Sequence, residues 1–254
     1  MARQSRVLSE TGMYHIMFRG INKQDIFSSE KDYQKLKDII QSAKENCNVQ
    51  IYAYCMMPNH VHLFLREAEA GDVSDFMKRI LSHYAGWYNF KYERTGHLFA
   101  NRYKSIPVED DSYFLILAKY IHQNPVKAGI VSDLSQYQHS SYLDYIHNID
   151  GFVDIDYLLS MYDEERSVAI KQFINFNMSS DDVDYDIENS VKMKEVAAKI
   201  KIMQLTGGMM PYEIRKLPKQ ERYKLLKTLI EEHNIQKIVL ERVTGISRRT
   251  MLNL

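Results

Sequence analysis

The sequence predicts an α+β fold: a ferredoxin-like split βαβ unit with a mainly antiparallel sheet, followed by a C-terminal all-helical domain. Three observations predict it. Up to about residue 130, short runs rich in β-branched and aromatic residues alternate with longer runs whose apolar residues have helical spacing. Their order, β-α-β-β-α-β-α, is that of a split βαβ unit with one helix added, and the helices are expected on one face of the sheet. From residue 191 onward, helical periodicity alone occurs.

The individual elements follow from the same patterns. The expected strands cover residues 14–18, 49–56, 60–66 and 104–109, and the expected helices cover residues 31–46, 72–92 and 113–123. Pro58 and Asn59 provide the turn of a hairpin between the second and third strands. Asp111 and Ser112 offer an N-cap for the third helix. One or two further helices are expected within residues 146–176.

Composition limits the cellular setting. No apolar run approaches the ~20 residues that a membrane-spanning helix requires, and the first ten residues lack the apolar stretch of a secretory signal. The two cysteines, Cys47 and Cys55, have no CxxC spacing and are expected to be reduced thiols. We therefore expect a cytoplasmic protein without a membrane partner.

The net charge is zero, but the charges are unevenly distributed. Residues 1–145 contain 17 basic and 16 acidic side chains, residues 146–190 contain 2 and 11, and residues 191–254 contain 14 and 6. We therefore expect a first domain over 1–145, a helical connector with an acidic linker over 146–190, and a basic helical domain over 191–254. A basic domain is typical of nucleic-acid binding, although a solvated helix surface has the same composition.

Two histidines, His60 and His62, flank one valine at the start of the third expected strand. Because side chains alternate along a strand, both imidazoles point to the same side. Two imidazoles held side by side can bind one metal ion. Taken alone, this short pattern is more typical of a strand with two exposed or paired histidines.

A second group of polar residues lies on the third expected helix. Tyr120 and Asn124 are four residues apart and share one helix face, whereas His122 faces elsewhere. Pro125 disfavours helical geometry at the preceding residue, so Asn124 is expected at or just past the helix end. If this end packs near His60 and His62, two imidazoles and an amide oxygen form a site for Mg²⁺ or Mn²⁺, which would also accept Zn²⁺ or Ni²⁺ in vitro.

The sequence resembles the HUH single-tyrosine transposases, and most closely the REP-associated (IS200-like) tyrosine transposase branch. Four segments in one order produce the resemblance: YHIMFRG at residues 14–20, YCMMPNHVHL at 54–63, GHLFANRYKS at 96–105 and YIHQNPVKAG at 120–129. The resemblance spans roughly residues 6–145, which is over half of the chain. Each segment is a weak signal by itself, and the four together are specific.

The resemblance implies an enzyme that nicks and rejoins single-stranded DNA flanked by hairpins. In such enzymes the two histidines bind a divalent metal, Mg²⁺ or Mn²⁺, and His60 and His62 match them. Tyr120 matches the nucleophile that forms a 5′-phosphotyrosine, and Asn124 occupies the position of a third metal ligand. A metal ion lowers the pKa of a nearby phenol, ordinarily ~10, and stabilises charge on phosphate oxygens. The family contains both monomers and homodimers.

Further basic residues are candidates for contact with DNA. Arg102 and Lys104 alternate with Phe99 and Tyr103, an arrangement in which cations bind phosphates and rings stack on bases. Arg19, after the first strand, is a similar candidate. A solvated loop would have the same composition.

Residues 238–251 resemble a helix-turn-helix that would bind duplex DNA. Gly245 suits the positive φ of the turn, and Ser247 suits the N-cap of the second helix. Arg248 and Arg249 would then face outward, together with Thr250 and Asn253. A plain helical hairpin has the same pattern.

Two other functions remain open on the sequence alone. A DNA-binding regulator that lost catalysis would keep the fold and bind without cleaving. A hydrolase that uses His60 and His62 to activate water would turn over without a covalent intermediate and would be indifferent to Tyr120.

Overall fold

The computed structural model describes residues 7–109, 111–149, 151–179, 195, 198–199, 201–203, 205–233 and 235–251, and residues 111–113 by their backbone alone. The chain divides into two compact units. The first consists of Met1–Glu109 and Leu117–Ser180, and the second of Asp110–Ile116 and Asp181–Leu254. Residues 151–179 therefore belong to the same unit as the sheet.

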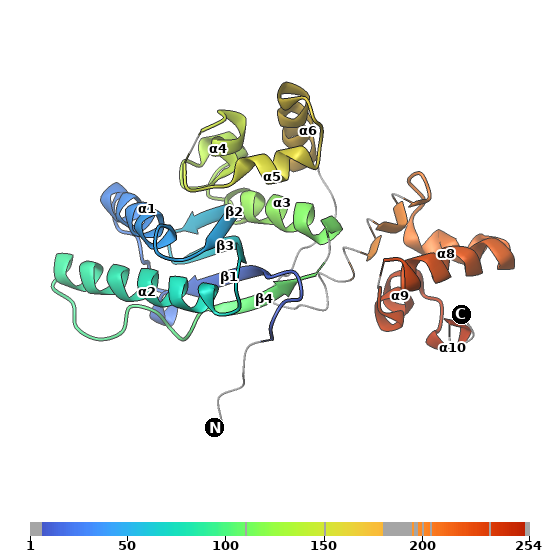
Figure 1. Ribbon diagram of the computed structural model, residues 1–254, viewed down its shortest axis with the longest axis horizontal. Helices are drawn as coiled ribbons and strands as arrows, with labels where there is room; N and C mark the ends of the chain where they lie inside the picture. The colour runs from blue at the N-terminus through green and yellow to red at the C-terminus, as the bar shows by residue number, and fades with distance from the viewer. Residues whose placement is uncertain are drawn as a thin grey trace. The chain divides into compact units, whose positions relative to one another are not determined.

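Four strands form one sheet in the first unit (Figure 1). They are β1 (Met13–Arg19), β2 (Val49–Met57), β3 (His60–Glu67) and β4 (Lys104–Val108). The strand order is β2-β3-β1-β4, and every pairing is antiparallel. Met57 pairs with His60 across the Pro58–Asn59 turn, so the predicted hairpin is confirmed. The α+β fold with an antiparallel sheet is likewise confirmed.

Helices cover both faces of this sheet (Figure 1). They are α1 (Glu30–Lys44), α2 (Asp72–Lys91), α3 (Asp111–Lys127), α4 (Tyr142–Ile146), α5 (Ile155–Ser160) and α6 (Arg166–Met178), with short 3₁₀ turns η1 (Ile21–Lys23) and η2 (Leu134–Gln136). On β1, Phe18 packs on Phe99, which contacts Tyr84 of α2. His15 points to the opposite face and contacts Tyr120 of α3.

The prediction that the helices lie on one face is therefore wrong. All but one residue of β2 are buried. A strand that is buried on both sides needs a layer of helices on each face. α1 and α2 cover one face, and α3 covers the other.

The start of α1 is tied to the end of α2 by one buried carboxylate. Asp32 accepts hydrogen bonds from the backbone N–H groups of Ser28 and Ser29, which lie at the start of the helix. Lys91 and Tyr92 at the end of α2 donate to the same carboxylate. These bonds hold the pKa of Asp32 below its usual range despite burial, so the carboxylate stays charged and fixes the two helices together.

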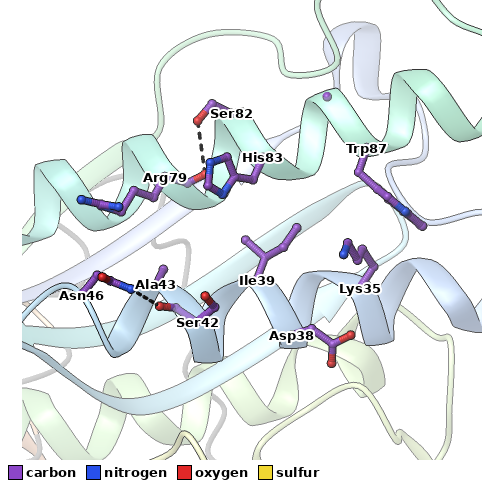
Figure 2. A pocket seen from close by; sticks show the side chains of 11 residues that line it. Lys35, Asp38, Ile39, Ser42, Ala43, Asn46, Arg79, Ser82, His83 and Trp87 are labelled. Carbon is purple, nitrogen blue, oxygen red and sulfur yellow. Dashed lines mark hydrogen bonds between the residues drawn. The ribbon is translucent and has the colours of Figure 1, made fainter.

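A groove of about 580 Å³ runs between α1 and α2, and Figure 2 shows Ile39 and Trp87 on its two sides. It lies on the sheet face opposite the histidines. Lys35 and Arg79 line the groove together with Asp38, so its charge is mixed.

The second unit is helical. It contains η3 (Pro211–Lys216), α8 (Lys219–Glu231), α9 (Lys237–Thr244) and α10 (Arg248–Met251). Its own apolar core consists of Ala198, Ile202, Ile214, Leu226, Leu229, Val239, Leu240, Val243, Ile246 and Met251. The predicted C-terminal helical region is thus confirmed. Among the helices described for the chain, none combines the length and apolarity needed to cross a bilayer.

Asp144 of α4 provides a test of pH-dependent stability. Burial raises the pKa of its carboxyl to about 6, although Lys37 and a hydrogen bond from Tyr54 act in the opposite direction. The folded state therefore binds more protons than the unfolded state between about pH 4 and pH 6, and this group lowers stability as pH rises through that window. We expect Asp144→Asn to stabilise the protein by ~1 kcal/mol more at pH 7.5 than at pH 5. Urea unfolding of both proteins at the two pH values measures this difference, and an equal effect at both would contradict it.

Candidate active site

His60 and His62 project from the same face of β3. Their ring centroids are 5.0 Å apart, with the ring planes at 80°. In the antiparallel register, Arg19 of β1 lies opposite His60, and Met17 lies opposite His62. His62 is buried and His60 is half-buried. Of the two rings, that of His62 is therefore enclosed by protein, whereas that of His60 is partly open to solvent.

Each of the two histidines has a hydrogen bond at Nδ1. Nδ1 of His60 lies 2.6 Å from Oδ1 of Asn59, whose Nδ2 donates to the carbonyl of Lys23. Oδ1 of Asn59 is thus the acceptor and His60 Nδ1 the donor, which places the lone pair of a neutral His60 on Nε2. Nδ1 of His62 lies 2.9 Å from Nε2 of His15. Histidines that bind metals usually have such a partner on the second nitrogen.

Burial favours the neutral form of the imidazoles of His15 and His62. Burial lowers the pKa of His15 to about 3. Burial also holds the pKa of His62 well below its usual range, and His15, His60 and Arg19 lower it further. A neutral imidazole keeps the lone pair that a metal ion needs.

Tyr120 of α3 lies against the two stacked imidazoles. Its ring centroid is 5.7 Å from that of His62 and 6.2 Å from that of His15, and it meets both rings edge-on. Nζ of Lys127 lies 5.5 Å from the centroid of the same ring. Tyr120 is half-buried. The fold therefore brings the histidines of β3 and the tyrosine of α3 into one site.

Asn124 does not sit where its sequence context predicted. α3 continues through Pro125 to Lys127, so the prediction that Asn124 lies at or past the helix end is wrong. Pro125 cannot donate the helical hydrogen bond to the carbonyl of Ile121, yet only two helical residues follow it, so the helix ends within one turn of the proline. Nδ2 of Asn124 donates to the carbonyl of Tyr120 at 2.9 Å, so Oδ1 is the atom with ligand character.

Comparison with known proteins identifies the domain. Residues 9–124 match the family model described as "Transposase IS200 like". Residues 9–124, a little under half of the chain, are therefore similar to IS200-like transposases, and we call this segment the transposase domain. The resemblance noted in the sequence is thus confirmed.

Two solved structures resemble the transposase domain. One is described as "Structure of the REP associates tyrosine transposase bound to a REP hairpin", with 20% identity, a TM-score of 0.50, and coverage of 61% of this chain and 90% of that chain. The other is a putative transposase from Deinococcus radiodurans, with 20% identity, a TM-score of 0.34, and coverage of 48% and 97%. At this identity the first shows a shared fold. The comparison with curated proteins gave no significant match.

Arg19 and Lys104 lie on the histidine face of the transposase domain. Lys104 of β4 pairs with Met17 of β1, which pairs with His62. Lys104 is therefore two strands away from His62, or ~10 Å at the usual strand spacing. Arg102 is exposed just before β4.

The aromatic neighbours of these cations face inward. Phe99 packs edge-on against Phe18, and Tyr103 is buried with its hydroxyl 3.4 Å from that of Ser74. The expectation that the Tyr103 ring stacks on bases is therefore wrong. Phe99 is half-buried, so base stacking on its ring stays a prediction.

The structure confirms the predicted orientation of His122 and places His15 in a position that the sequence did not predict. His122 faces away from Tyr120, as predicted. Its Nδ1 is hydrogen-bonded to Oδ1 of Asn177, and its Nε2 is hydrogen-bonded to Oγ of Ser141. The sequence did not predict His15 beside His60 and His62, because the β1–β3 register is not visible in it. Among the described residues, no three His, Cys, Asp or Glu side chains are grouped as a metal site.

A short turn joins the C-terminal helices α9 and α10. Gly245 has a φ of 70° and ends α9, and Ser247 Oγ accepts from Thr250 N at 3.4 Å. Arg248 and Arg249 are both exposed, and Arg248 forms a 2.8 Å ion pair with Glu241. Asn253 lies outside the described residues. Binding of duplex DNA by these helices stays a prediction.

Proposed function

We propose that the protein is a metal-dependent single-stranded DNA nuclease and strand transferase that uses Tyr120 as its nucleophile. The observation that supports this most directly is the position of Tyr120, edge-on to His62 and His15. The transposase family agrees with a DNA substrate. The structural neighbour is bound to a REP hairpin, so we propose hairpin-flanked single strands as the substrate class.

A divalent ion fits the donor set. His60 and His62 would hold Mg²⁺ or Mn²⁺ through Nε2, because hydrogen bonds engage both Nδ1 atoms. Oδ1 of Asn124 would be the third ligand. When bound, the ion supplies Lewis-acid polarisation of the scissile phosphate. Two nitrogens and an amide oxygen also suit Zn²⁺, so the metal used is decided by availability.

The chain's own residues then perform a transesterification. Oη of Tyr120 attacks the phosphorus, its proton passes to water, and the bond to the 3′ oxygen breaks to release a 3′-OH. The new bond is a 5′-phosphotyrosine. One phosphodiester replaces another, so a 3′-OH can reverse the step without an external energy source. Arg19 and Lys104, on the same sheet face, would bind flanking phosphates.

The direct test is a covalent adduct. The full chain is incubated with Mn²⁺ and hairpin-bearing single strands labelled on the 3′ side of the cleavage site, and the products are separated under denaturing conditions. We expect labelled DNA to migrate with the protein. Binding without cleavage across many hairpins and metals would instead indicate a regulator, and cleavage without an adduct would indicate a hydrolase.

Arg19→Gln tests the proposed DNA path. We expect affinity for the single strand to fall roughly threefold to tenfold, and the slope of log K against log salt to shrink by about 0.7, the value for one lost phosphate contact. Fluorescence anisotropy at several salt concentrations measures both. Lys35→Gln, the same charge change in the groove on the opposite face, is the control. Equal effects of the two variants would show general electrostatics rather than a defined path.

A further inference from the structure

His15 has an environment that folding alone does not explain. Its side chain is 1% exposed, and its ring is stacked on that of His62 with centroids 5.2 Å apart and planes 11° apart. Its Nε2 lies 2.9 Å from Nδ1 of His62. Its own Nδ1 is buried without a hydrogen-bond partner. Leaving a polar atom unpaired in the interior is unfavourable, so the position of this ring calls for a compensating role.

We propose that His15 is a positioning residue, which holds His62 in the tautomer and orientation that direct Nε2 to the metal ion. The inference depends on the metal-ligand role proposed for His62. His15 would not bind the metal ion itself, because its hydrogen bond is to Nδ1 of His62 and not to Nε2, the proposed ligand atom.

The hydrogen-bond logic defines the proton positions. A metal ion on Nε2 of His62 leaves the proton of a neutral ring on Nδ1, which then donates to His15. Nε2 of His15 must therefore be the acceptor, and its single proton lies on Nδ1. Nδ1 of His15 is the buried unpartnered atom, so the metal-competent arrangement places an unpaired N–H in the protein interior.

His15 also contacts the nucleophile. Its ring meets the Tyr120 ring at 78°, and the ring of His62 meets it at 84°. The two stacked imidazoles therefore form a single surface against which the tyrosine packs. Loss of His15 would disturb the ligand nitrogen and the tyrosine together, whereas loss of an unrelated buried histidine would disturb neither.

Three substitutions separate this role from simple packing. His15→Gln carries its amide oxygen four bonds from Cα, as histidine carries Nε2, and can accept from His62. His15→Asn is polar but one bond shorter, and His15→Leu fills the space without an acceptor. We expect Leu and Asn to weaken Mn²⁺ binding by about 10- to 100-fold, the usual effect of losing such a partner. We expect Gln to remain within about threefold of the wild type.

Metal binding is measured without DNA, from the free-Mn²⁺ signal in electron paramagnetic resonance, and thermal unfolding is recorded for each variant. His122→Gln is the matched control, since it alters another buried histidine and is expected to change stability but not Mn²⁺ affinity. Unchanged Mn²⁺ binding in a folded Leu variant, or equal losses in Gln and Leu, would overturn the proposal.

The wild type provides a second test that needs no substitution. Long-range ¹H–¹⁵N spectra of the histidine rings at saturating Mg²⁺ should show that His15 is protonated at Nδ1 and unprotonated at Nε2. Protonation at Nε2 would overturn the proposal even if every variant unfolded. Both readouts are independent of strand cleavage, so failure of the phosphotyrosine chemistry would not be mistaken for failure of this inference.

Discussion

Replacing Tyr120 by phenylalanine is expected to abolish the covalent protein–DNA adduct and to lower strand cleavage on the order of 10³-fold or more. The phenol oxygen is the nucleophile in the proposed reaction, and nothing else in the site replaces it. The phenylalanine ring keeps the edge-on packing against His62 and His15, so DNA binding and the melting temperature should stay near those of the wild type. Adduct formation on denaturing gels, together with anisotropy and thermal unfolding, measures the three quantities.

The control for Tyr120→Phe is the same change at another tyrosine. Tyr103 is buried and its hydroxyl lies 3.4 Å from that of Ser74, so Tyr103→Phe removes a phenol oxygen outside the site. We expect it to retain the adduct. An adduct that persists in Tyr120→Phe would contradict the assignment of the nucleophile.

His62→Ala is expected to lower the Mn²⁺-dependent cleavage rate by roughly 10²- to 10³-fold, because Lewis-acid stabilisation is worth several kcal/mol in the transition state. Chelation of the metal by EDTA should reduce the wild type to a similar rate. The variant should also lose ~1–3 kcal/mol of stability, since Nε2 of His15 loses its partner in the interior. Cleavage rates over a range of Mn²⁺ concentrations, measured beside urea unfolding, separate the two effects.

The matched control for His62→Ala is His83→Ala. His83 is an exposed histidine of α2 that lines the groove on the other face of the sheet. We expect no change in metal dependence. If EDTA left wild-type cleavage intact, or if His62→Ala kept full activity, the metal would have no part in the reaction.

Much of the fold was predictable because it depends on local patterns. Runs rich in β-branched and aromatic residues locate the strands, and the helical runs between them give the order of a split βαβ unit. The alternation of side chains along a strand places His60 and His62 side by side. Helical spacing correctly predicted that His122 faces away from Tyr120.

What could not be predicted depends on contacts between distant segments. The β1–β3 register decides that His15 stands behind His62, and a shift of one residue would turn it to the other face. The packing of Phe99 and the burial of Tyr103 depend on contacts with Tyr84 and Ser74 of α2. Pro125 was expected to end α3 at Asn124, and the helix instead ends at Lys127, two residues beyond the proline.

The position of Tyr120 and His62 in one polypeptide has a consequence for stoichiometry. Because Tyr120 lies beside His60 and His62 of the same copy, the proposed reaction forms one phosphotyrosine bond per copy at a time. Cutting a DNA segment at both ends by this reaction would therefore take either two copies or two successive rounds by one molecule.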